Sequence, residues 1–169
     1  MTPEELTQVL SDHKVWLAGT GGKRADLSYA RLCWADLRGA YLSRAKLRGA
    51  DLYKADLSSA NLSDANLSDA DLCWANMRGA YLSRAKLRDA NMNWQSHDLL
   101  AEVLRQAAGD NADRRMLAGL VLVSRDWCWK EFMALDHPET EWAKGVLREY
   151  VTANTPANVR EWLGEEAGK

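Results

Sequence analysis

The chain has 169 residues, a formal net charge of −2 and a sequence pI of about 5.9, so no overall field selects nucleic acid or an anionic membrane surface. The longest apolar run, at 116–123, is far shorter than the roughly 20 residues that a membrane-spanning helix needs. The acidic N-terminus does not resemble a signal peptide, and three cysteines without a CxxC pair indicate neither a disulfide framework nor a zinc site. We therefore expect a soluble protein of the reducing cytoplasm.

The first segment, 1–24, has the pattern of a helix followed by a joint. Thr2 and Glu5 match a capping box, with Pro3 at the first helical position. Apolar residues at helical spacing then predict one stripe, formed by Leu6, Val9, Leu10 and Trp16. We predict an N-terminal cap helix, with GTGGKR at 19–24 as the joint to the next segment.

Residues 25–94 repeat with a period of five. Alanine recurs at every fifth position from Ala25 to Ala90, fourteen times in succession, and the second residue after each alanine is Leu or Met. A step of five rotates an α-helix by about 140° and reverses the face of a flat strand, so neither element keeps these leucines on one side. A chain that changes direction once per repeat does so, and four such turns close one coil.

A run of A-[DNKRY]-[LM]-x-x units of this length resembles the pentapeptide-repeat family. The resemblance implies that leucine and the preceding alanine point inward and that the other three positions point outward. It covers about 70 of the 169 residues. The fold class expected from it is mainly β with α caps: a right-handed four-sided β-helix of about 3.5 coils over 25–94, the N-terminal cap helix, and a small all-α unit over 95–169 with a short polar tail.

Helical spacing replaces the five-residue rhythm after residue 94. Ser96 is placed to cap the first of these helices, and Pro138 and Pro156 to begin the last two as their first residues. Five helices are predicted, over about 97–108, 112–123, 125–135, 138–151 and 156–163.

Few residues are arranged for catalysis. His13, His97 and His137 lie in three separate segments, and the expected interior of the repeats is aliphatic, with no buried acid, base or nucleophile. The GTGG run is not followed by a helix, as a phosphate-binding loop would be. We therefore predict no enzymatic activity, no cofactor and no metal site.

One column of the expected coils carries tryptophan. Taking every fourth repeat, its last positions are Trp34, Lys54, Trp74 and Trp94. A lysine between tryptophans at coil spacing is placed for cation–π contacts, and aligned surface tryptophans usually indicate burial against something. The sequence leaves three alternatives open: a terminal helix covers the column, a partner or second copy does, or the column stays exposed.

Two other columns alternate in charge. The simplest interpretation, without a functional role, is a solvent-exposed ladder of salt bridges. One contains Arg44, Asp64 and Arg84. The other contains Lys46 and Arg48, followed one coil later by Asn66 and Asp69 and then by Lys86 and Arg88. Cys33 and Cys73 share a column two coils apart, about 9–10 Å, which is too far for a disulfide.

The C-terminal third offers a second candidate interface. Its aromatic residues are expected mostly in a core, but Trp127 and Trp129 flank Cys128 and cannot point the same way. One of them should face outward or toward another element.

The resemblance implies a binding or scaffold protein without catalysis. We therefore expect a non-enzymatic protein–protein interaction or scaffold module that binds a protein partner or itself, for instance as a homodimer, and neither membrane nor nucleic acid. The alternative that the same family implies is a DNA-mimicking protein that binds a topoisomerase such as gyrase. Such mimicry needs a one-signed negative surface, whereas residues 25–94 contain eight Asp, no Glu and ten Lys plus Arg.

Overall fold

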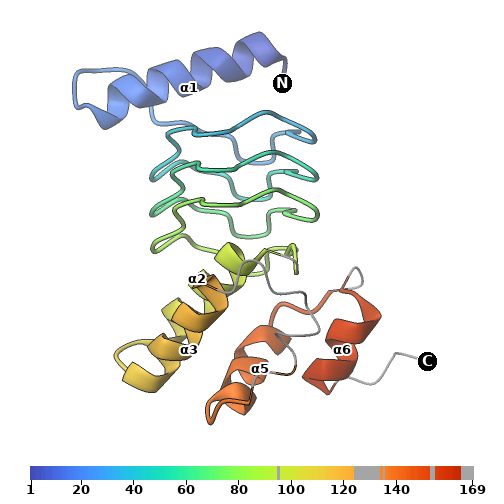
Figure 1. Cartoon of the computed structure of the whole chain (residues 1–169). Helices are drawn as coiled ribbons and strands as arrows, with labels where there is room; N and C mark the ends of the chain where they lie inside the picture. The colour runs from blue at the N-terminus through green and yellow to red at the C-terminus, as the bar shows by residue number, and fades with distance from the viewer. Residues whose placement is uncertain (95, 124–133, 135, 153–154, 165–169) are drawn as a thin grey trace. The chain divides into compact units, whose positions relative to one another are not determined.

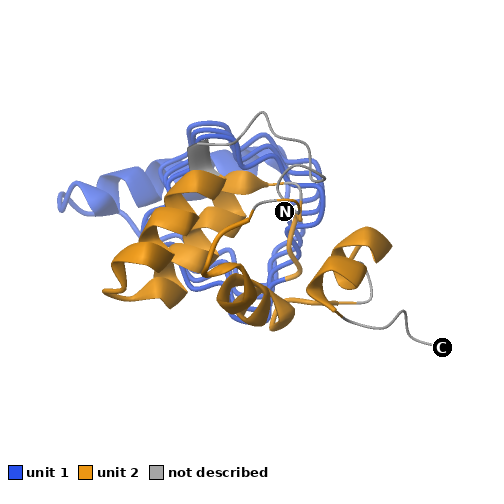
Figure 2. Cartoon of the chain, turned by 60° about the horizontal axis from the view of Figure 1, so that its bottom comes forward, with its two compact units in different colours: residues 1–90 blue, residues 91–169 orange. Residues whose placement is uncertain are grey.

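A computed structural model describes residues 1–94, 96–123, 134, 136–152 and 155–164. The chain divides into two compact units, 1–90 and 91–169, coloured separately in Figure 2. The regular elements of the described residues are five α-helices: α1 (Pro3–Leu17), α2 (His97–Ala108), α3 (Ala112–Val123), α5 (Thr140–Arg148) and α6 (Ala157–Leu163) (Figure 1). No helix within these residues is long and apolar enough to cross a membrane.

The N-terminal helix α1 begins as predicted. The Thr2 side chain accepts a hydrogen bond from the Glu5 N–H, the Glu5 carboxylate accepts one from the Thr2 N–H, and Pro3 is the first helical residue. The predicted apolar stripe is only half-buried, however, and the one fully buried residue of α1 is His13.

The repeats pack their third positions inward. Every Leu or Met at this position, from Leu27 to Leu87, is at most 4% exposed, and the alanines two residues earlier are buried or half-buried. The predicted division into inward leucine and alanine and outward remaining positions is confirmed. The interior of the repeats is therefore an aliphatic column of leucine, methionine and alanine side chains.

The chain turns at the last position of each repeat. From Tyr29 to Asp89 these positions have φ values between 55° and 69°, in the left-handed region. The next alanine N–H donates to the preceding leucine carbonyl, as Ala30 does to Leu27 at 3.1 Å, and a left-handed third residue is what a type II turn requires. In eight repeats an Asp or Asn at the second position also accepts a hydrogen bond from the N–H two residues later.

Successive coils are joined through their backbones and are visible as stacked loops in Figure 1. The Leu27 N–H donates to the Lys46 carbonyl at 2.8 Å, and the Lys46 N–H donates to the Ala25 carbonyl at 3.0 Å. This pattern recurs at each repeat as isolated parallel bridges, and no strand forms within the described residues.

The predicted fold class, mainly β with a right-handed four-sided β-helix, is therefore wrong. Helices are the regular elements of the described chain, and the repeats contribute only single-residue bridges. The physical reason lies in the turn: a left-handed residue ends each five-residue unit, so the extended backbone is interrupted before a second consecutive bridge can form.

The second unit contains the first two helices of the C-terminal region as predicted. Ser96 caps α2, its side-chain oxygen accepting a hydrogen bond from the Leu99 N–H, and α3 has the predicted bounds. Helix α2 contacts α3 and α5, and α5 contacts α6. The predicted helix at 125–135 falls largely outside the described residues.

The prediction that Pro138 and Pro156 are first helical residues is wrong. A separate turn precedes α5, because the Thr140 N–H donates to the His137 carbonyl and the Thr140 hydroxyl accepts from the His137 N–H. Pro156 has an extended ψ of 143° and lies just before α6. Both prolines therefore precede their helices instead of beginning them.

Candidate interaction surface

Three repeats one coil apart carry the candidate surface. The Trp34 N–H donates to the Tyr53 carbonyl and the Lys54 N–H donates to the Cys73 carbonyl, both at 3.0 Å, so these repeats are direct neighbours. We call their fourth and fifth positions the tryptophan face: Cys33, Trp34, Tyr53, Lys54, Cys73 and Trp74.

The fifth positions of this face are left-handed. Trp34, Lys54 and Trp74 have φ values of 61°, 55° and 60°. This conformation costs a residue with a side chain about 1–2 kcal/mol, and glycine avoids the cost, as at Gly39 and Gly79. The backbone alone would favour glycine at the two tryptophan positions, so their side chains are not explained by the turn.

A preformed cluster lies at one end of the face. The Lys54 ammonium lies 4.4 Å from the centroid of the Trp34 ring and 5.2 Å from that of Tyr53. The Trp34 and Tyr53 rings meet edge to face, with centroids 6.5 Å apart. The predicted cation–π contact is thus confirmed for Trp34, whereas no ring or cation contact is made to Trp74 by the part of the chain that is described.

The tryptophans of the predicted column differ in exposure. Trp34 is 68% and Trp74 60% exposed, whereas Trp94, which belongs to the second unit, is 4% exposed. The Trp94 indole N–H has no hydrogen-bond partner among the described residues. Trp94 is therefore not part of an exposed surface, and the other two predicted candidates, Trp127 and Trp129, lie outside the described residues.

A smaller aromatic row, which the sequence patterns above did not indicate, lies elsewhere on the repeats. Tyr41 and Tyr81 are both more than half exposed, and each forms a bridge with Asn61 between them. The Lys14 ammonium of α1 lies 5.6 Å from the Tyr41 ring centroid. The signal was available, since residues 73–90 nearly repeat residues 33–50 and place both tyrosines two coils apart, as they do Trp34 and Trp74.

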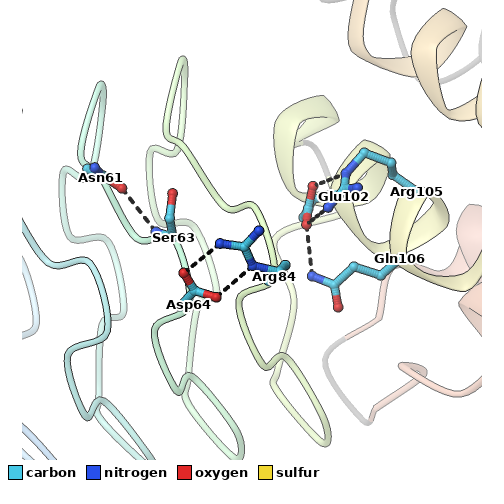
Figure 3. Close-up of polar contacts among 7 residues, drawn as sticks. All are labelled: Asn61, Ser63, Asp64, Arg84, Glu102, Arg105 and Gln106. Carbon is cyan, nitrogen blue, oxygen red and sulfur yellow. Dashed lines mark hydrogen bonds and ion pairs between the residues drawn. The ribbon is translucent and has the colours of Figure 1, made fainter. Parts of the chain in front are cut away.

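The charges of the repeats pair with one another. Arg84 donates two hydrogen bonds to Asp64, at 2.7 and 2.9 Å, which lowers the pKa of Asp64 (Figure 3). Other pairs join Arg48 to Asp69 and Lys46 to Asp26, each at 2.9 Å. The predicted ladder is confirmed for Arg84–Asp64 and Arg48–Asp69, whereas the Lys46–Asp26 pair was not predicted. Figure 3 also shows a separate network within α2, where Glu102 accepts from Arg105 and Gln106.

The family model for pentapeptide repeats (8 copies) matches residues 25–64 and 65–94. The chain belongs to the pentapeptide-repeat family. Proteins of this family are generally non-catalytic repeat structures, of varied or unclear function. No protein of curated function matches the chain.

Several solved structures of pentapeptide-repeat proteins are similar to it. One, from the cyanobacterium Cyanothece 51142, is 33% identical over 40% of this chain and 51% of its own, with a TM-score of 0.34. A second is HetL, involved in heterocyst differentiation regulation in Nostoc sp. strain PCC 7120, which is 34% identical over 42% of this chain and 40% of its own, with a TM-score of 0.29. A third, from the thylakoid lumen of Arabidopsis thaliana, is 22% identical over 46% of this chain and 72% of its own, with a TM-score of 0.31. The chain spans about half or less of the first two.

The two cysteines on the pentapeptide repeats are not in disulfides. Cys33 is exposed and Cys73 half-buried, and neither forms a disulfide, as predicted. The Cys33 thiol donates a hydrogen bond to the Asp51 carboxylate at 2.8 Å, which raises the pKa of the thiol. A raised pKa disfavours the thiolate, so Cys33 is not an activated nucleophile.

His13 connects α1 to the first repeats. Its Nδ1 accepts a hydrogen bond from the Ala25 N–H at 3.1 Å, so the proton is on Nε2, which donates to the Ser43 carbonyl at 3.0 Å. The ring stacks on Trp16, and burial lowers the pKa of His13. These two hydrogen bonds of His13 hold α1 against the first repeats. The described residues contain no group of three His, Cys, Asp or Glu that could hold a metal ion.

Proposed function

We propose that the tryptophan face binds another protein and that the chain acts as a non-enzymatic interaction or scaffold module. The observation that carries this proposal is the pair of tryptophans, 68% and 60% exposed, at positions where the turn favours glycine. Tryptophan is enriched among the residues that supply most of the energy of protein interfaces, and aligned exposed tryptophans are typical of such sites.

The two tryptophans contribute little to the folded repeats. The core consists of the leucines and alanines, which are buried without them. Among the described residues the Trp34 ring makes an aromatic contact with Tyr53 and a cation–π contact with Lys54, and its left-handed backbone opposes stability. Binding to another protein therefore explains two large apolar side chains at these positions better than packing within the repeats does.

We propose the cytoplasm as the compartment. The exposed thiol of Cys33, which is not in a disulfide, supports a reducing environment. The topoisomerase-binding alternative is less well supported, because carboxylates such as Asp64 and Asp69 are paired with arginines and leave no continuous acidic surface on the repeats.

The proposal is tested by removing both tryptophans without straining the turns. We would compare wild type with W34N/W74N, since asparagine tolerates the left-handed region, and with Y29N as a matched control at another exposed fifth position. Affinity capture from the native cells, followed by mass spectrometry, should recover a specific protein with wild type and Y29N and lose it with W34N/W74N. Recovery of the same proteins by all three would contradict the proposal, provided that circular dichroism shows equal folding.

A further inference from the structure

The tryptophan face has a fixed spacing along the stacking direction. Hydrogen bonds of 2.8–3.0 Å join its coils, so they lie at the sheet spacing of about 4.8 Å. Trp34, Lys54 and Trp74 therefore rise in two equal steps, and the two tryptophan positions are about 9.6 Å apart.

This spacing matches one face of an α-helix. Residues three or four apart on a helix rise by about 4.5–6 Å and residues seven apart by about 10.5 Å, all on the same side. An extended strand places same-side residues about 6.7 Å apart, which fits neither the single nor the double coil step. A helix that lies parallel to the stacking direction can therefore contact Trp34, Lys54 and Trp74 at the same time.

The charge of Lys54 indicates which kind of side chain should lie at the centre of such a helix. Lys54 forms no ion pair with any carboxylate of the described residues. The nearby acids are already engaged: Asp51 accepts from the Tyr53 N–H and the Cys33 thiol, and Asp71 accepts from the Cys73 N–H. Lys54 is thus a cation beside aromatic rings that has no counter-ion among the described residues.

Building on the proposed function, we propose that the tryptophan face binds an α-helix of a partner protein. Apolar side chains at i and i+7 of that helix lie against Trp34 and Trp74, and a carboxylate at i+3 or i+4 pairs with Lys54. A second copy of this chain fits poorly. A two-fold axis through the middle of the face would bring the two Lys54 ammonium groups together, and like charges in an interface are unfavourable.

The test uses three labelled synthetic peptides and the full-length chain, with binding measured by fluorescence anisotropy. The first peptide is a stable helix with leucine at i and i+7 and glutamate at i+4, and the second differs only in lysine at i+4. The third is a proline-rich peptide. In a polyproline helix, residues on the same side are about 9.3 Å apart, so such a peptide could contact both tryptophans without pairing with Lys54.

The glutamate helix should bind at least about tenfold more tightly than the lysine helix, as expected for a desolvated charge pair. W34N/W74N should abolish this binding, Y29N should leave it unchanged, and K54E should reverse the preference between the two helices. Equal binding of both helices, no binding of either, tighter binding of the proline-rich peptide, or a dimer in solution that W34N/W74N dissociates would each overturn the inference.

The two proposals fail differently. If affinity capture depends on the tryptophans but the helical peptides show no charge preference, the face binds protein and the helix inference is wrong. If capture does not depend on the tryptophans, the proposed function itself is wrong.

Discussion

Replacing His13 with leucine should release α1 from the first repeats. His13 is fully buried, and its two ring nitrogens bond the Ala25 N–H and the Ser43 carbonyl. Leucine keeps the apolar volume but leaves both backbone groups without their partner. Each such loss costs about 1–3 kcal/mol, so we expect α1 docking to weaken by about 2–6 kcal/mol, a large part of the stability of a typical domain.

The docking of α1 through His13 should also depend on pH. The Nδ1 atom can accept from Ala25 only while it is unprotonated, and burial lowers the pKa of His13, with Arg24 adding to the effect. The folded pKa is therefore below the unfolded value of about 6.5. Between the two values the unfolded state binds more protons, so docking is at full strength above about pH 6.5 and weakens as pH falls through the folded pKa.

Hydrogen exchange of the α1 amides measures both effects. At pH 7.5, H13L should exchange at least about 25-fold faster in α1 than wild type, which corresponds to about 2 kcal/mol. After correction for intrinsic rates, wild type should lose protection between pH 7.5 and 5.5, whereas H13L should show no such loss, and H137L should behave as wild type. Unchanged α1 protection in H13L, or the same pH dependence in both proteins, would refute the reasoning.

The repeats allow two further predictions by urea unfolding. Gly49 and Gly39 both have a φ of 63°, but a Cβ on Gly49 would meet the Tyr29 ring at 2.5 Å while one on Gly39 meets nothing within 4 Å. G49A should therefore lower the unfolding midpoint more than G39A, and equal shifts would contradict this contact. L62A removes a fully buried side chain in the middle coil and should cost about 2–5 kcal/mol, so a loss below about 1 kcal/mol would argue against a packed core.

Much of the repeat architecture could be predicted from local rules. The five-residue period determines which side chains point inward, because Leu57 and Leu62 can share one interior only if the chain turns between them. The capping box of Thr2 and Glu5 needs only neighbouring residues and was found for that reason. The Arg84–Asp64 pair followed from the coil length alone.

The errors concern features that local rules do not decide. The β class failed because the left-handed residue of each turn limits the bridges to single residues. The helix start at Pro138 failed because a turn closed by Thr140 competes with it. The role of His13 was missed because its partners Ala25 and Ser43 are distant in sequence, and no pattern links them.

Photo-crosslinking in the native cell tests most directly whether the tryptophan face binds another protein. A photoreactive phenylalanine analogue is placed at position 74 of the full chain, and separately at position 29 as the control, since Trp74 and Tyr29 are both exposed fifth positions of their repeats. We expect a discrete crosslinked protein at position 74 and none at position 29. No crosslink at position 74, or the same products at both positions, would contradict binding through the tryptophan face.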